Sequence, residues 1–389
     1  MNSKIAITSL ASISPLGNDS KTIWENYLNA NHCFTEKESN GKKVLVARLA
    51  DDSKQLIEIL KNADGKYKSL DNSVLFGMFA ARKAMAASNW KKEDNFGINM
   101  GSSRGATELF EKHFETFLTT GAAPTLTSPT TTLGNISSWI AHDLQTQGPE
   151  ISHSITCSTA LHAVLNGIAW LRAGMAEKFL VGGSEAPLTP FTIAQMQALK
   201  IYAKENNAFP NRALDLEKKQ NTLILGEGAA VCCLEIENAT KAIAYISGIG
   251  FATEILAHNI SISAEANCFQ KSMKMALKDT HLSEIDVVVM HAPGTIKGDL
   301  SEMKAIEKIF GGNLPLLTSN KWKIGHTFGA SGMLSIEMAI LMMQNDFFIQ
   351  VPYIKQQTQK RAIKKVLINA VGFGGNAVSI VLEKASCER

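Results

Sequence analysis

The strongest constraint on the fold is a duplicated order of expected strands and helices along the chain. Alternating β-type runs, buried runs that end in glycine-bearing loops, and apolar helical segments occur in the same order twice. The matched pairs are residues 4–15 with 241–252, 96–105 with 285–295, 152–173 with 317–321 and the expected helix after 325–326, and 229–236 with 376–382. Alternating strands and helices indicate parallel-rich sheets covered by helices. We therefore predict two similar halves, residues 1–240 and 241–389, with the break near 238–241 and two stacked sheets with helices between and outside.

Composition limits the classes of partner and cell compartment. The 389 residues carry 39 Lys and Arg against 36 Asp and Glu, a net charge of +3 that does not favour nucleic acid. No apolar run reaches membrane-spanning length, and no signal peptide precedes the first expected strand. The six cysteines form no C-x-x-C pair, which argues against a disulfide framework or a zinc site. We expect a cytoplasmic protein with no nucleic-acid, membrane or metal partner.

One group of lysines leaves two interpretations open. A solvated face and a docking face for an acidic protein both fit such a group. Its members are Lys42, Lys43, Lys54, Lys61, Lys66 and Lys68.

Cys157 lies between an expected strand and an expected helix. The helical segment is rich in Ala and Leu, covers residues 160–173, and is followed by Gly174 as a plausible stop. A thiol at the start of a helix meets the positive end of the helix dipole and free backbone N–H groups, which favours its thiolate. The alternative is a buried apolar cysteine, as most unpaired cysteines are. Cys157 is thus a candidate nucleophile.

Two histidines far downstream strengthen that interpretation. His291 ends the apolar run 287–290 and precedes a Pro-Gly loop, a place that side-chain packing explains poorly. His326 lies in the segment KIGHTFGASG, whose small residues allow other backbone to approach closely. A histidine satisfied within the core is the alternative for each of them.

Together these motifs resemble the β-ketoacyl-[acyl-carrier-protein] synthases, the condensing enzymes of fatty acid and polyketide synthesis, over nearly the whole chain. The shared order of motifs is more specific than any one of them. Besides Cys157, His291 and His326, the matching segments are SPLGN at 14–18 with Trp24, GGSEA at 182–186, GEGA at 226–229, GD at 298–299 with Glu302, KWKIGHTFGASG at 321–332, and GFGGN at 372–376.

The resemblance implies a fold and a chemistry. The fold is α/β and thiolase-like, with duplicated βαβαβ halves in a five-layered α-β-α-β-α sandwich. Cys157 would carry the acyl group, with the backbone N–H groups of Cys157 and Phe373 as the oxyanion hole. His291 and His326 would stabilise the enolate left by decarboxylation of a malonyl thioester. The resemblance also implies a buried ion pair of Lys321 with Glu302 that orients the site.

The same resemblance implies the partners. The substrates would arrive on the phosphopantetheine of acyl carrier protein, with no metal or redox cofactor. The chain would form a homodimer through residues 150–156, and a heterodimer with a second ketosynthase-like subunit is the alternative. Joining two central sheets there would bury a strand edge.

Several positions depart from the family pattern. Thr295 matches one of two threonines that hold the pantetheine arm, whereas Pro293 replaces the other. Residues 217–222 replace an arginine-aspartate-glycine stretch, and Asn376 comes one position early. Arg104 stands where long-chain enzymes carry a small or aliphatic residue. A guanidinium needs a partner when buried, so Arg104 either turns outward to pair across a dimer or caps a short pocket and binds a polar or carboxylate-ended acyl group.

Three rival assignments are weighed against an elongating synthase. A non-catalytic chain-length-factor-like partner would usually lack the cysteine, which is present here. A thiolase would carry a second cysteine near the C-terminal glycine motif, whereas Cys387 lies beyond the last expected strand. An initiating synthase would have asparagine in place of His326. The departures suggest a specialised pathway such as polyketide or aryl polyene synthesis, and the sequence does not name the acyl primer.

Overall fold

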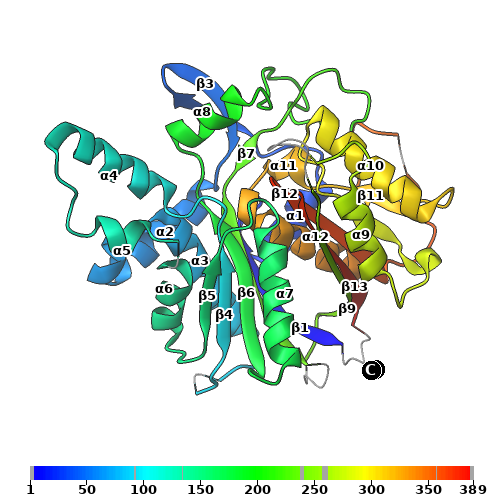
Figure 1. The fold of residues 1–389 in the computed structure, drawn as a ribbon, viewed down its shortest axis with the longest axis horizontal. Coiled ribbons are helices and arrows are strands. Elements are labelled where there is room, and N and C mark those ends of the chain that lie inside the picture. The colour runs from blue at the N-terminus through cyan, green and yellow to red at the C-terminus, as the bar shows by residue number, and fades with distance from the viewer. Residues whose placement is uncertain are drawn as a thin grey trace.

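The computed structural model describes residues 4–91, 93–133, 135–236, 241–255, 262–355 and 357–385 (Figure 1). Most of the expected break, residues 238–240, lies outside the described residues, as does Cys387. Within the described part of the chain, no helix is long and apolar enough to cross a membrane.

The first half supplies five strands of the central sheet. They lie in the order β5-β4-β6-β8-β1, with the first three parallel and β8 and β1 antiparallel to their neighbours. Their bounds are β1 Ile5–Ile13, β4 Gly97–Gly101, β5 Glu150–His153, β6 Lys178–Glu185 and β8 Gly228–Ile236. The short strand β5 ends this half of the sheet, so one of its edges has no partner strand in the described chain.

The second half repeats that arrangement. Its strands lie in the order β11-β10-β12-β13-β9, again with three parallel strands followed by two antiparallel ones. Their bounds are β9 Ala244–Thr253, β10 Val287–Val289, β11 Leu316–Thr318, β12 Lys365–Gly372 and β13 Asn376–Lys384. When the five strands of each half are numbered along the chain, their order across the sheet is 3-2-4-5-1 in both halves. This is the duplication that the sequence predicts.

The two halves share an edge. Residues 5–7 of β1 pair antiparallel with 244–246 of β9, so hydrogen bonds connect all ten strands. The sequence predicts two stacked sheets, and each half supplies one five-stranded unit. The short pairing of β1 with β9 joins the two units and connects the halves into one body.

Helices complete the five layers. Helices α3 (Asn72–Ala87) and α6 (Asn135–Leu144) cover the outside of the first sheet, and α9 (Asn267–Ala276) covers the second, with α10 (Ile296–Phe310) beside it. Helices α7 (Thr159–Arg172) and α12 (Ser331–Asn345) pack between the sheets. Almost every residue of α12 is buried, as expected of a helix that is apolar on all sides.

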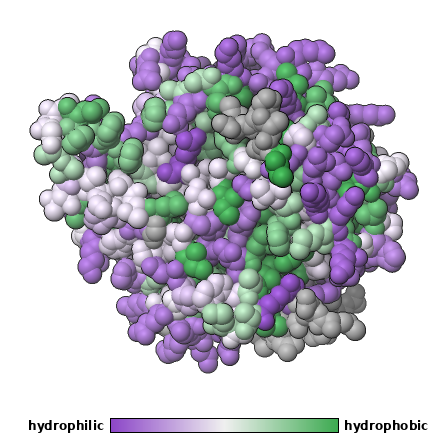
Figure 2. Space-filling model, viewed as in Figure 1, coloured by the Kyte–Doolittle hydropathy of each residue, from purple (hydrophilic) through white to green (hydrophobic). Residues whose placement is uncertain are grey.

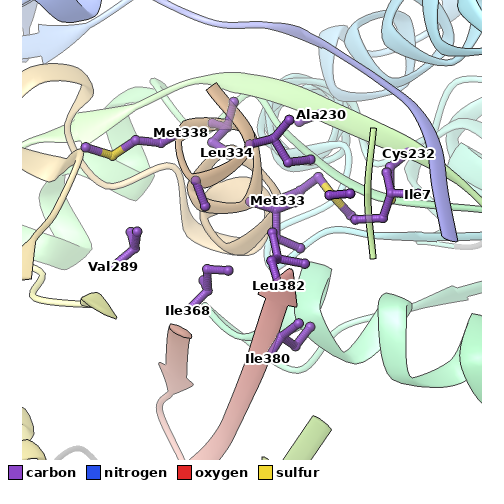
Figure 3. Close-up of a cluster of buried hydrophobic side chains, with 14 of the residues drawn as sticks. Ile7, Ala230, Cys232, Val289, Met333, Leu334, Met338, Ile368, Ile380 and Leu382 are labelled. Atoms are coloured by element: carbon purple, nitrogen blue, oxygen red, sulfur yellow. The ribbon is translucent and has the colours of Figure 1, made fainter. Parts of the chain in front are cut away.

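The core between the sheets is built around α12. Figure 3 shows Met333, Leu334 and Met338 of this helix lying among Ile368 and other strand side chains of both halves. Because this layer contacts both sheets, it fixes the loops at the ends of their strands relative to one another. The candidate catalytic residues lie on those loops.

Shorter elements surround the sandwich. A small sheet has the order β2-β3-β7. The remaining bounds are α1 Ser20–Leu28, β2 Thr35–Ser39, β3 Lys42–Ala47, α2 Asp51–Ala63, η1 Gly65–Ser69, α4 Thr107–Thr120, α5 Thr127–Thr131, α8 Pro190–Ala198, β7 Leu225–Gly226, η2 Leu282–Glu284, α11 Lys321–Ile324 and η3 Phe328–Ala330.

Candidate functional site

Cys157 lies in a sharp turn between a strand and a helix, as predicted. Strand β5 ends at His153 and α7 begins at Thr159, close to the expected helix start at residue 160. Thr156, directly before the cysteine, has a φ of 46°, a left-handed conformation that is costly for a β-branched residue. Its hydroxyl donates to the carbonyl of Phe373 at 3.4 Å, which ties this turn to the loop after β12. The thiol is therefore held in a strained turn between the two halves.

His291 follows the buried strand β10, and a carboxylate fixes its backbone. The main-chain N–H groups of His291 and Ala292 donate to the two oxygens of Glu302 at 2.9 and 2.8 Å. Asn369 on β12 donates to the same carboxylate at 3.2 Å. Glu302 on α10 thus holds the loop that carries His291, while the imidazole itself is free of this contact.

His326 lies beside His291, in the segment between α11 and η3. The ring centroids are 5.2 Å apart and the rings are nearly perpendicular, at 79°. The main-chain N–H of Phe328 donates to Nδ1 of His326 at 3.2 Å, so a neutral ring must carry its proton on Nε2. This hydrogen bond makes Nε2–H of His326 a donor toward the cavity.

Both imidazoles are held neutral. Burial, followed by the neighbouring His326 and the Lys321 ammonium, lowers the pKa of His291 well below its ordinary value. Burial and then Lys321 lower the pKa of His326 to about 3. At neutral pH both rings are therefore uncharged hydrogen-bond donors rather than imidazolium ions.

One cavity of about 720 Å³ joins these three residues. Cys157, His291 and His326 line it together with the predicted Phe373 and Thr295 and with Pro293. The apolar part of the wall is formed by Met196, Leu199, Ile201, Leu223 and Phe328, and Asn221, Lys297 and Ser301 contribute polar atoms. Thr295 also caps the start of α10, where its hydroxyl accepts from the N–H of Gly298 at 3.2 Å.

The electrostatic expectation for Cys157 was wrong. We expected the helix start to favour the thiolate, but burial raises the pKa of Cys157 to about 12. The nearby Glu185 carboxylate raises this pKa as well, whereas Arg104 and Lys321 lower it. Desolvation outweighs the helix terminus here because the side chain is only 6 % exposed. The raised pKa keeps the Cys157 thiol neutral near pH 7.

The expected ion pair between Lys321 and Glu302 does not form. Among the described residues, these two make no contact within 4 Å, and the Lys321 ammonium instead donates to Asn320 Oδ1 at 3.1 Å. Burial lowers the pKa of Lys321 to about 8 and raises that of Glu302 to about 7. Backbone N–H groups and an asparagine satisfy Glu302, which removes the need for a cationic partner. The Lys321 charge lowers the pKa of both histidines, and the Glu302 charge in turn raises the pKa of Lys321 without a direct ion pair.

A different buried ion pair supports the cavity wall. The Lys218 ammonium contacts Asp299 Oδ2 at 2.7 Å, and both side chains are almost fully buried. Asp299 also accepts the N–H groups of Gly294 at 3.1 Å and Leu214 at 2.9 Å. It therefore holds the loop between Pro293 and Thr295. In the sequence, Asp299 belongs to the matching segment at 298–299 and Lys218 to the departure at 217–222, but nothing in the sequence pairs the two residues.

Glu185 is a second residue whose role the sequence did not reveal. It ends β6 and is fully buried, and one of its oxygens accepts the N–H groups of Ser103 and of Gly329, the latter at 3.0 Å. Burial raises its pKa to about 7. The carboxylate connects the loop after β4 with η3. The sequence feature that could have indicated this role is an acidic residue in the glycine-rich segment 182–186.

Arg104 turns inward and is half-buried. Its Nη1 donates to Oε1 of Gln195 on α8 at 2.6 Å, and its guanidinium lies 5.0 Å from the centroid of the Phe328 ring. Arg104 is not among the described residues that line the cavity. It contacts Phe328, which forms part of the cavity wall.

The arrangement combines one thiol nucleophile with two neutral hydrogen-bond donors in a single cavity. Such a site can hold an acyl group on sulfur and stabilise negative charge on a second bound thioester. In the described part of the chain, no three or more His, Cys, Asp or Glu side chains gather closely enough to hold a metal ion. The described cysteines, Cys33, Cys157, Cys232, Cys233 and Cys268, are all free thiols.

Family models and related proteins match most of the chain. The model for the β-ketoacyl synthase N-terminal domain matches residues 2–239, and that for the C-terminal domain matches 243–355. The chain is 27% identical to a 3-oxoacyl-[acyl-carrier-protein] synthase 2 of Coxiella burnetii over 98% of each protein. It is 26% identical to the protein of the same name from Staphylococcus aureus strain COL, over 98% of this chain and 99% of that protein.

Solved structures share the fold. The ishigamide ketosynthase/chain length factor has a TM-score of 0.86 at 18% identity, covering 99% of this chain and 100% of that one. A β-ketoacyl synthase from Burkholderia phymatum has a TM-score of 0.85 at 22% identity with the same coverage. These likenesses confirm the predicted thiolase-like α/β fold.

Proposed function

The chain belongs to the β-ketoacyl synthase family, and from that premise we propose that it catalyses decarboxylative condensation of an acyl group on Cys157 with a malonyl thioester. The observation that carries this proposal is one cavity lined by Cys157, His291 and His326, with both imidazoles neutral. The alternative is a chain-length-factor-like partner without activity. Such a partner would not need a cysteine and two neutral histidines in one cavity.

The first step is transfer of the acyl group to sulfur. The Cys157 thiol loses its proton and attacks the carbonyl of an acyl thioester on acyl carrier protein. The tetrahedral intermediate collapses, the pantetheine thiolate leaves, and it takes up a proton. We assign the oxyanion of this intermediate to the backbone N–H groups of Cys157 and Phe373, because the loop with Phe373 contacts the cysteine turn.

The second step creates and uses a carbanion. Malonyl thioester loses carbon dioxide, and the electron pair left behind is delocalised onto the thioester oxygen as an enolate. Nε2–H of His326 and an N–H of His291 donate to that oxygen. The carbanion attacks the acyl-Cys157 carbonyl, the C–S bond breaks, and the product leaves two carbons longer with Cys157 regenerated. No metal or redox cofactor takes part in these steps.

Substrate recognition follows from the cavity wall. We assign contact with the pantetheine arm to Thr295, beside Pro293, at the polar part of the cavity. Arg104 selects the acyl primer through Phe328 and disfavours long saturated chains. A specialised pathway, such as polyketide or aryl polyene synthesis, fits the departures at Arg104, Pro293 and residues 217–222 better than housekeeping elongation.

The proposed partners are acyl carrier protein in the cytoplasm and a second subunit. A solved structure similar to this chain is described as a type II polyketide acyl carrier protein in complex with its ketosynthase, and another as a ketosynthase with its chain length factor. For this chain, exposed Lys200, Lys204, Lys219 and Lys297 lie on segments beside the cavity mouth, where an acidic carrier could dock.

We propose that a second copy pairs along β5, the strand at the edge of the first sheet. The helices α4 and α5 project on the same side of the molecule (Figure 1). Figure 2 shows exposed apolar side chains where α4 lies. The large apolar side chains that α4 exposes are Phe110, Phe114, Phe117 and Leu118. Their spacing places them on one helix face. Sedimentation of a stable monomer at micromolar concentration would contradict a homodimer, and a heterodimer is the fallback.

The decisive experiment separates acyl transfer from condensation. The protein is incubated with a series of acyl carrier thioesters, and the mass added to Cys157 is measured on the intact chain and on the peptide. Acylation of wild type that is absent in Cys157→Ala supports the proposal, whereas equal labelling of both, or of neither, refutes it. Malonyl decarboxylation by His291→Ala or His326→Ala should fall by a factor on the order of 10² to 10³.

A further inference from the structure

Phe328 has a backbone conformation that needs outside support. Its φ is 39°, in the left-handed region, which is a true outlier for a bulky residue. Such residues cost on the order of 1–3 kcal/mol and persist only where the surrounding structure over-determines them. The residues that contact Phe328 therefore indicate which function the strained turn serves.

Four contacts hold this turn. The N–H of Phe328 donates to His326 Nδ1 at 3.2 Å, and its ring lies 5.4 Å from the His326 ring. The next residue, Gly329, donates its N–H to Glu185 at 3.0 Å. On the other side, the Arg104 guanidinium lies 5.0 Å from the centre of the Phe328 ring. The aromatic ring is thus placed between an imidazole and a cation.

Arg104 is itself fixed in place. Its Nη1 donates to Gln195 Oε1 at 2.6 Å, so α8 sets the position of the guanidinium. A guanidinium within about 6 Å of a ring centroid is attracted to the negative face of the aromatic ring. The same loop is tied to Gly329 through Glu185, which accepts the N–H of Ser103. Arg104 and Glu185 therefore hold the Phe328 turn from two sides.

We propose that Arg104 is a positioning residue for His326, acting through Phe328. Its guanidinium, anchored by Gln195, keeps the Phe328 ring and backbone in the strained turn. In that turn, the Phe328 N–H occupies Nδ1 of His326 and so keeps the imidazole proton on Nε2, facing the cavity. Without Arg104 the turn relaxes, Nδ1 loses its donor, and both neutral tautomers of His326 become populated. The kinetic consequence, though not the tautomer itself, rests on the proposed function.

The direct test reads the His326 tautomer by nitrogen-15 NMR of histidine-labelled protein at pH 7.5. Assignment uses the His326→Gln variant. Wild type should show a single Nε2–H tautomer, whereas Arg104→Ala and Gln195→Ala should show a mixture. Gln195→Ala keeps the arginine charge and therefore separates positioning from charge. Arg172→Ala, an exposed arginine on α7, is the matched control and should match wild type.

The kinetic test isolates the decarboxylation step. Malonyl-carrier decarboxylation is measured in a Cys157→Gln background, where an amide stands in for the acylated thiol and the cysteine pKa no longer matters. Adding Arg104→Ala or Gln195→Ala should lower the rate on the order of tenfold, less than loss of a whole donor. Arg172→Ala should leave it unchanged.

The outcomes separate the two proposals. An unchanged His326 tautomer in both Arg104→Ala and Gln195→Ala overturns the positioning role, whatever the kinetics. A mixed tautomer with a decarboxylation rate within twofold of the parent overturns its catalytic consequence. Absence of decarboxylation in Cys157→Gln with Arg104 intact counts against the proposed function instead, and the NMR result still decides the positioning role. If Arg104→Ala fails to fold, Gln195→Ala carries both tests.

Discussion

The reactivity of Cys157 gives the sharpest prediction, because the sequence and the structure lead to opposite results. A thiol activated by a helix start would be largely ionised near neutral pH and would react with an alkylating agent at a rate that no longer rises with pH. A buried thiol with a raised pKa would react slowly and gain reactivity steadily as the pH rises. The perturbation is therefore the pH itself, with iodoacetamide as the probe of thiolate.

The magnitude follows from the surroundings of the sulfur. Burial raises the pKa of Cys157 from an ordinary 9.0 to about 12. A difference of about three pKa units lowers the thiolate fraction about a thousandfold relative to an exposed cysteine, because one unit is a factor of ten. At pH 7 roughly one thiol in 10⁵ would be ionised. The alkylation rate should then rise about tenfold per pH unit from pH 7 to 10.

The assay uses peptide mapping by mass spectrometry, so each cysteine is followed separately in one sample. Cys33 is the internal reference, because burial raises its pKa only to about 11, and it too should show no plateau below pH 10. Glu185→Gln is the informative variant. Removing this carboxylate lowers the pKa of Cys157, so alkylation should be faster than in wild type above pH 7, where Glu185 is ionised. Below pH 6 the two proteins should converge.

A plateau in the Cys157 rate between pH 7 and 9 would refute this reasoning. It would show that the helix start and the Lys321 and Arg104 charges overcome desolvation. An unchanged rate in Glu185→Gln across the whole range would refute the role of that carboxylate alone.

Three further predictions concern residues around the site and in the core. Lys218→Met leaves Asp299 buried without its cation and should lower the free energy of unfolding by about 3–5 kcal/mol in urea titration, and equal stability would exclude a net-favourable pair. Gly372→Ala would push a methyl group into the turn that carries Cys157, so acylation should fall at least about tenfold, whereas Gly312→Ala, in open space, should match wild type. Glu337→Gln should become more stable relative to wild type by about 3 kcal/mol as the pH rises from 4.5 to 7. Burial raises the pKa of Glu337 from 4.5 to about 7, so over this range the carboxyl ionises in the unfolded chain but stays protonated in the folded protein, which lowers the stability of wild type alone; a pH-independent difference would contradict this.

Much of the fold could be predicted because it depends on periodicity and order. Strand-like runs and apolar helices recur in the same sequence in both halves, and the strand orders of the two halves are identical. The joining of β1 to β9 could not be predicted in this way. It involves only three residues on each strand, and nothing in an alternating pattern distinguishes a free edge from one paired across halves.

The positions of Cys157, His291 and His326 were predictable for a related reason. Cys157 follows the edge strand β5, His291 follows the buried strand β10, and His326 follows the short helix α11. Loops of this kind gather at the ends of strands that share a layer. Their partners were not predictable. Glu302 accepts from two backbone N–H groups rather than from an ammonium, and residue spacing does not encode that choice of partner.

The charge states of the site follow from burial, which a linear motif does not report. Lys321, Glu302 and Glu185 are all almost fully buried, and desolvation moves the pKa of each toward neutrality. The same desolvation keeps the two histidines neutral and Cys157 protonated. For a reaction that must stabilise a transient enolate, neutral donors have an advantage over charged ones, because they need not be desolvated as ions before substrate binds. In the proposed reaction, the high thiol pKa keeps Cys157 a neutral thiol until an acyl thioester enters and the thiol gives up its proton.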